Sequence, residues 1–127
     1  MAFKLGKEKR QIRISKNPPI FRKNLEKGIL GEANMDGSIF VDKSVKPGSA
    51  LDKRIQRHEG HHAKEMKANK IYYNDNTVVD KIAGVTYKRK NGKLIVDESK
   101  NPKLKKGDSF VEGSNSLPHE QRAKKAE

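Results

Sequence analysis

Residues 49–66 read SALDKRIQRHEGHHAKEM, and this stretch has the spacing of an amphipathic helix. Apolar residues and two histidines recur in it at intervals of three and four, and together they are Ala50, Leu51, Ile55, His58, His62 and Met66. This spacing puts them on one face of a helix. We therefore predict a helix over about residues 50–69 that turns His58 and His62 towards the interior of the fold.

The start of this helix has signals of its own. Pro47 and Gly48 interrupt the chain immediately before it. Ser49 can accept a hydrogen bond from the first turn, and Asp52 stands three residues later, which is close to a capping box. These residues predict that the helix begins directly after Ser49.

Residues 58–62 spell H-E-x-x-H. Positions four apart lie about 6 Å apart along a helix axis and on the same side, so one metal ion can bind both imidazoles. Glu59 is then placed to act as general base, which is the arrangement of zinc proteases. The cofactor that the pattern predicts is therefore zinc. The alternative is a helix with an ordinary core face, in which Glu59 pairs with a basic side chain on the helix surface.

A catalytic zinc ion takes three protein ligands and leaves one position open, so a third ligand is needed. We favour Asp75, because a chain that turns back after the helix can present its carboxylate, although residues 74–76 also read as an ordinary Asn-Asp-Asn turn. Within the helix, Glu65 lies too far along the axis from His58, and His61 points away from the apolar face. Further candidates follow the helix at Asp80, His119 and Glu120.

The pattern on either side of the helix indicates strands, so the predicted fold class is α+β. Residues 28–34 and 38–42 are β-prone with a Met-Asp-Gly turn between them, which predicts a β-hairpin. The pair Asn91-Gly92 is a strong signal for a second, C-terminal hairpin. The strands after the helix are predicted at residues 71–75, 77–82, 85–88 and 93–97.

Composition divides the chain into three parts. Residues 1–27 carry nine basic and two acidic side chains and are predicted to form an extended basic arm, with a short strand at residues 11–14. Residues 28–97 are the predicted zincin-like core. Residues 98–127 are rich in Lys, Gly, Ser, Asn and Pro and predict a polar tail, in which residues 119–127 can form a short helix.

The chain of 127 residues has a formal net charge of +13, and only 32% of its residues are hydrophobic. Such a charge is explained either by a solvated surface or by binding to an acidic protein. Binding to nucleic acid is a secondary expectation, because only 6% of the residues are aromatic and few side chains could stack on bases. The absence of cysteine excludes disulfides and thiolate zinc sites. No apolar run suits a transmembrane helix or a signal peptide, so we expect synthesis in the cytoplasm and no membrane partner.

The stretch from residue 31 to residue 62 resembles a minimal zincin, in which a hairpin leads to an edge strand and a Pro-Gly loop leads to the H-E-x-x-H helix. Zincins hold substrate along such an edge strand. The resemblance therefore implies that the substrate lies along Ile39, Phe40 and Val41.

The same resemblance implies that His58 and His62 are metal ligands and that Glu59 is the catalytic glutamate. The sequence departs from two zincin groups. No downstream helix with a ligand glutamate is evident, as gluzincins require, and no third histidine follows six residues after His62, as metzincins require.

The chain is also similar to small proteins encoded among the structural genes of tailed bacteriophages. The similar pieces are the His-Glu helix and residues 30–34, 36–42, 73–76, 87–92, 112–114 and 117–118. This resemblance implies a structural or assembly component of the virion, made in the host cytoplasm, whose basic arms contact other virion proteins. An active zinc metallopeptidase of the H-E-x-x-H type is the alternative, and a nucleic-acid-associated protein is a third.

Overall fold

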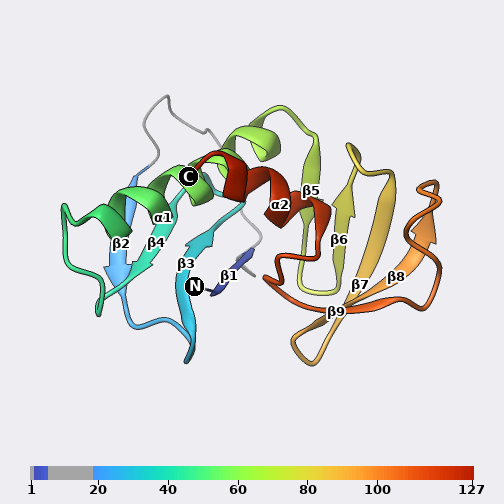
Figure 1. Cartoon of the computed structure of the whole chain (residues 1–127), viewed down its shortest axis with the longest axis horizontal. Helices are drawn as coiled ribbons and strands as arrows, with labels where there is room; N and C mark the ends of the chain where they lie inside the picture. The colour runs from blue at the N-terminus through green and yellow to red at the C-terminus, as the bar shows by residue number, and fades with distance from the viewer. Residues whose placement is uncertain (1, 6–18) are drawn as a thin grey trace.

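The computed structural model describes residues 2–5 and 19–127 of the chain (Figure 1). Within these residues the chain folds into two helices and two β-sheets, which confirms the predicted α+β class. Helix α1 (Ala50–Lys67) lies on the first sheet, and helix α2 (Pro118–Lys125) packs against α1 at the centre of the molecule (Figure 1). The strand predicted at residues 11–14 lies outside the described residues.

The first sheet has the strand order β1-β3-β4-β2. Strands β3 (Ile29–Ala33) and β4 (Ile39–Asp42) are antiparallel and form the predicted hairpin. Gly37 adopts a φ of 84° in its turn, a conformation that glycine accepts because it has no Cβ to clash with the backbone. Strands β1 (Ala2–Leu5) and β2 (Ile20–Lys23) flank this hairpin, and each pairs in parallel with its neighbour.

Strand β4 is not an edge strand, so this part of the zincin-like prediction is wrong. Strand β2 pairs with the side of β4 that faces away from β3. Ile20 lies opposite Ile39, and the register is maintained to the end of both strands. The backbone groups that a substrate would need are therefore already paired within the fold. An edge-to-face contact between Phe21 and Phe40, with ring centroids 6.2 Å apart, adds to this pairing.

Helix α1 begins where the sequence predicts. The Ser49 side chain accepts a hydrogen bond of 3.1 Å from the backbone N–H of Asp52, so Ser49 is the N-cap. The helix ends at Lys67, slightly earlier than predicted, and Asn69 adopts a φ of 57° just beyond it. The inner face of α1 packs on β3 and β4 through a small core of Ile39, Val41, Val45 and Ile55.

The start of α1 is also tied to β2. Arg22 donates two hydrogen bonds to the Asp52 carboxylate, at 2.9 and 3.0 Å. The Asp52 side chain is almost fully buried, and it accepts further hydrogen bonds from the Gly48 N–H and the Gln56 amide. Because the charged groups meet in this fork-like geometry, the pair holds β2 in place beside the helix.

The second sheet is an antiparallel meander with the strands in chain order. The predicted C-terminal hairpin is confirmed: Asn91 and Gly92 form its turn with φ values of 52° and 76°. Strand β9 is not predicted, because three residues are too few to show an alternating pattern. The strands are β5 (Ile71–Tyr73), β6 (Thr77–Asp80), β7 (Val85–Lys90), β8 (Lys93–Ser99) and β9 (Ser109–Val111).

The larger core joins the second sheet to the end of α1 and to the start of α2. Its buried residues are Ala33, Met66, Ile71, Tyr73, Val78, Val85, Tyr87, Leu94, Val96, Leu104 and Leu117. Two of them, Leu104 and Leu117, belong to the segment predicted as a polar tail. Leu117 is fully buried at the N-cap of α2, so it fixes the helix on the core. The predicted short C-terminal helix is therefore present and packed.

The described residues do not pack as an arm, a core and a tail. Strands β1 and β2 belong to the predicted arm but are part of the first sheet. The predicted boundary at residue 97 falls inside β8, and β9 extends the same sheet further. In the described part of the chain, neither helix is long and apolar enough to cross a membrane.

Candidate metal centre

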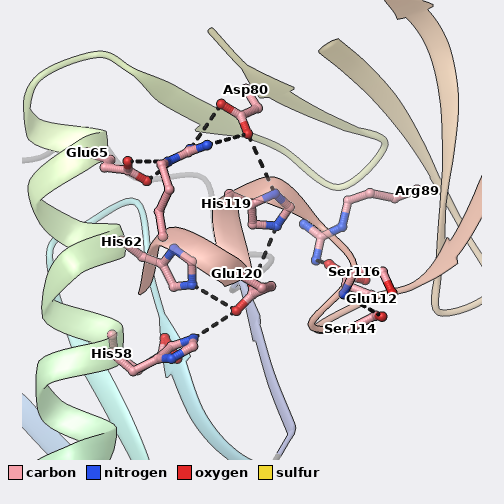
Figure 2. Close-up of polar contacts among 12 residues, drawn as sticks. His58, His62, Glu65, Asp80, Arg89, Glu112, Ser114, Ser116, His119 and Glu120 are labelled. Carbon is pink, nitrogen blue, oxygen red and sulfur yellow. Dashed lines mark hydrogen bonds and ion pairs between the residues drawn. The ribbon is translucent and has the colours of Figure 1, made fainter. Parts of the chain in front are cut away.

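Helix α1 brings His58 and His62 together on its inner face. Both side chains are fully buried, and their ring centroids lie 5.0 Å apart. The two residues are four apart in the sequence and follow the apolar spacing of the helix, so their inward direction agrees with the prediction. One nitrogen of each ring is directed away from α1 towards helix α2 (Figure 2).

Helix α2 supplies a carboxylate to both rings. The Oε1 atom of Glu120 lies 2.8 Å from Nε2 of His58 and 3.1 Å from Nε2 of His62 (Figure 2). Two imidazole nitrogens and one carboxylate oxygen therefore meet at one point. This is the His-His-Glu donor set of many catalytic zinc sites.

Glu120 was one of three further candidates in the sequence and was not the favoured one. A downstream helix is nevertheless present as α2, and its Glu120 faces both histidines. The available signals were Pro118, a residue favoured in the first helical turn, and the apolar positions Leu117 and Ala123. They predict a helix but not that it returns to α1, because that contact depends on tertiary packing.

Glu59 is a buried carboxyl group without a hydrogen-bond partner. Its side chain is fully buried, and both of its oxygens lack a hydrogen-bond partner. Its Oε1 lies 3.9 Å from Nε2 of His58. Burial raises the pKa of Glu59 well above its usual value, with the neighbouring His62 acting in the opposite direction. Natural proteins rarely leave such a group unsatisfied, and exceptions are concentrated at functional sites.

The electrostatics of the centre favour a positive charge between Glu120 and the histidines. Burial alone would lower the pKa of His62, but the ion pair and hydrogen bond with Glu120 raise it to about 9. Burial opposes ionisation of Glu120, yet its two histidine neighbours bring the pKa of this carboxyl group well below the usual range. The region between Glu120 and His62 therefore suits a cation.

His119 is a third imidazole beside this cluster. It is almost fully buried, and its ring centroid lies 5.9 Å from that of His62. Its Nε2 is 3.4 Å from Oε2 of Glu120, and its Nδ1 is 4.0 Å from Oδ2 of Asp80 (Figure 2). Burial lowers the pKa of His119 to about 4 in spite of these carboxylates, so the ring is neutral at pH 7.

An arginine engages two other acidic candidates. Arg122 donates hydrogen bonds to Glu65 at 2.7 and 3.2 Å and to Asp80 at 3.1 and 3.0 Å. Glu65 and Asp80 are both buried. Because a guanidinium group neutralises them, these carboxylates join α1, α2 and β6 and do not take part in the three-donor cluster.

The remaining predicted site residues do not reach the cluster. Asp75, the favoured third ligand, is exposed in the turn between β5 and β6, whereas both histidines are fully buried. The turn chemistry of residues 74–76 explains its position, since Asn74 accepts a hydrogen bond from the Asn76 N–H at 2.8 Å. His61 is partly buried at the side of α1, where its Nε2 lies 3.3 Å from Glu65.

A metal ion fits the cluster on chemical grounds. One ligand atom from each of His58, Glu59 and His62 lies within 4.8 Å of the others. Glu120 adds a second carboxylate at hydrogen-bonding distance from both histidines. A separate cavity of about 380 Å³ opens over β6, β7 and β8, and its lining includes Asp80 but none of these four residues.

No protein-family model, curated protein or solved structure matches this chain. The geometry of the cluster is therefore the basis for a functional assignment.

Proposed function

We propose that the chain is a small zincin-like protein that holds one zinc ion through His58, His62 and Glu120 and hydrolyses peptide bonds. The observation that carries the proposal is the approach of Oε1 of Glu120 to Nε2 of both histidines. This third donor comes from a downstream helix, as it does in the gluzincin pattern. Neutral imidazoles and a carboxylate suit zinc, and three protein ligands leave a fourth position for the reaction.

A bound zinc ion would supply Lewis-acid activation of a peptide carbonyl and of the attacking water. The chain supplies the general base. Glu59 lies next to the ligand His58 on the same helix, and neither of its oxygens has a hydrogen-bond partner in the fold. It can accept a proton from the attacking water and hold it until the leaving amine takes it up. Burial raises the pKa of this carboxyl group, which suits a residue that must both accept and donate a proton.

Neighbouring groups keep these residues in position. His119 lies beside the second oxygen of Glu120, and Arg122 ties α2 to α1 through Glu65. Because the helices that carry the donors are joined in this way, the three ligands keep their positions relative to one another. Such support is needed, since misplacement by about 1 Å can reduce catalysis on the order of a hundredfold.

Comparison of the wild-type chain with Glu59→Gln tests the catalytic part of the proposal. Fluorescently labelled casein serves as the probe, and zinc affinity is measured on the same samples. We expect Glu59→Gln to abolish casein cleavage and to leave zinc affinity within a few fold of wild type. Glu98→Gln, a change at an exposed position on β8, is the matched control and should behave as wild type. Cleavage by the Glu59→Gln variant at the wild-type rate would refute the mechanism.

A second candidate function is a structural zinc clip within a virion component. The observation that favours it is burial: His58, Glu59 and His62 are fully buried, and Glu120 is 1% exposed. In this role zinc would join α1 to α2 without turnover, and the net charge of +13 would serve binding to acidic proteins of the particle. Zinc-loaded wild type that cleaves no casein, but loses stability when zinc is chelated, would favour the clip over the peptidase.

The setting in a bacteriophage particle stays a proposal that rests on the resemblance of the sequence. Binding to nucleic acid is the remaining alternative, and it predicts an affinity that falls steeply with salt. Absence of binding to a DNA duplex at low salt would remove it.

A further inference from the structure

The ligand His58 has a second carboxylate on its other ring nitrogen. Its Nδ1 lies 2.7 Å from Oε2 of Glu127, while its Nε2 faces Glu120. Glu127 follows helix α2, and its side chain is only 9% exposed. The ring of His58 is thus held between two carboxylates, one at each nitrogen.

The side chain of Glu127 is itself fixed by α1. Arg54 donates a hydrogen bond of 3.1 Å to Oε1 of Glu127, and the Nε of Arg57 donates one to its main-chain oxygen. Both arginines lie on the turn of α1 that precedes the metal-binding histidines. One oxygen of the carboxylate therefore binds Arg54, and the other is directed at the ring of His58.

This contact bears on the tautomer that zinc binding needs. A zinc ion bound between Glu120 and the two histidines would take the lone pair of Nε2 of His58, which leaves the proton of a neutral ring on Nδ1. An oxygen of Glu127 lies 2.7 Å from Nδ1 and can accept its hydrogen bond. Glu127 therefore suits the tautomer that metal binding requires, while Nε2 faces the space in front of Glu120.

We propose that Glu127 is a positioning residue that orients His58 and fixes its tautomer for zinc; the inference rests on the proposed zinc site. A carboxylate behind a ligand histidine also makes its nitrogen a stronger base, and loss of such a partner typically costs about 10–100-fold in metal affinity. His62 differs in this respect, because its Nδ1 has no hydrogen-bond partner. The two histidines are therefore not equivalent, and the effect of Glu127 is specific to His58.

The test measures the zinc affinity of the full chain and of two variants, Glu127→Ala and Glu127→Gln, by competition with a zinc chelator. We expect Glu127→Ala to bind zinc about 10–100-fold more weakly. Glu127→Gln keeps an oxygen that can accept the Nδ1 proton, so it should recover part of this loss. Glu98→Ala, at an exposed site on β8, controls for the loss of one carboxylate from the surface and should bind as wild type.

Long-range proton–nitrogen NMR of the zinc-loaded chain supplies a second readout, which a purely structural role would not change. In wild type, the ring of His58 should carry its proton on Nδ1, and this proton should exchange slowly with water. In Glu127→Ala, the proton should exchange faster. Equal zinc affinity and equal exchange in wild type and Glu127→Ala would overturn the role of Glu127 while leaving the zinc site intact. A wild-type chain that binds no zinc would overturn both.

Discussion

Oε1 of Glu120 lies 2.8 Å from Nε2 of His58, although the two residues stand 62 positions apart in the chain. The whole second sheet and the connection to α2 are placed between them in sequence. The meander must return the chain to α1 for this contact to form, and Leu117 at the start of α2 is buried in the core that the meander builds. The candidate metal centre is thus a product of the complete fold and not of the H-E-x-x-H helix alone.

The first prediction concerns Glu120 as the proposed third ligand. Glu120→Gln removes the negative charge but preserves the shape of the side chain, so it should weaken zinc binding by more than the roughly 10–100-fold typical of a residue behind a ligand. Asp75→Asn, in the exposed turn between β5 and β6, is the matched control and should bind zinc as wild type does. The measurement is chelator competition at constant pH. A larger loss in Asp75→Asn than in Glu120→Gln would show that the third ligand is misassigned.

Only the part of the candidate site that lies on helix α1 could be predicted from the sequence. A spacing of four residues sets the direction of His58 and His62, because helical geometry is local. The choice between Asp75 and Glu120 is not local. Asp75 follows the helix, where a chain that turns back can present its carboxylate, whereas Glu120 arrives through packing of a helix in a segment whose composition suggests a polar tail.

The second prediction concerns the stability cost of Glu59. A fully buried carboxyl group without a hydrogen-bond partner destabilises the fold, so its replacement by an apolar side chain of similar length should stabilise the metal-free protein. We expect Glu59→Met to raise the free energy of unfolding by about 1 kcal/mol. Urea denaturation of the metal-free proteins measures this change. A Glu59→Met variant that is clearly less stable than wild type would mean that Glu59 is a structural residue.

The third prediction concerns Arg122. Removal of its guanidinium group leaves Glu65 and Asp80 buried without a counter-charge, so Arg122→Ala should reduce the free energy of unfolding by about 3 kcal/mol. Lys88→Ala, which breaks an exposed ion pair with Asp97 at 3.6 Å, is the control and should cost less than about 1 kcal/mol. Urea denaturation compares the two. Similar small effects of both changes would contradict a role for Arg122 in joining the helices to β6.

The fourth prediction concerns pH. The hydrogen bonds from Arg22 hold the pKa of the Asp52 carboxyl group below its usual value. A carboxyl group with a lowered pKa in the folded state stabilises the protein above its unfolded pKa of about 3.9, and this contribution is lost as the pH falls through the folded value. Asp52→Asn should therefore cost about 2 kcal/mol at pH 7. The difference from wild type should shrink as the pH falls below about 4.

Urea titrations of wild type and Asp52→Asn at several pH values between about 7 and about 3 measure this difference. A difference that stays constant over the whole range would contradict the ion pair between β2 and α1. Arg22→Ala should reproduce the same pH dependence, because it removes the other partner of the pair.

The fold itself was predictable where turns and periodicity are strong. The hairpins at Gly37 and at Asn91-Gly92 follow from residues that accept a positive φ, and both are present. The N-terminal strands were not predictable, because β1 and β2 have four residues each and pair with strands distant in sequence. From the sequence alone β4 therefore reads as an edge strand, whereas in the structure β2 covers it.

The most direct test of the central claim is the zinc content of the purified chain, compared with that of a His58→Ala/His62→Ala double variant. Elemental analysis of both proteins after dialysis against metal-free buffer provides the measurement. We predict about one zinc ion per chain in wild type and almost none in the double variant. Wild type without zinc, or equal zinc in the two proteins, would contradict the claim that His58, His62 and Glu120 form a metal centre.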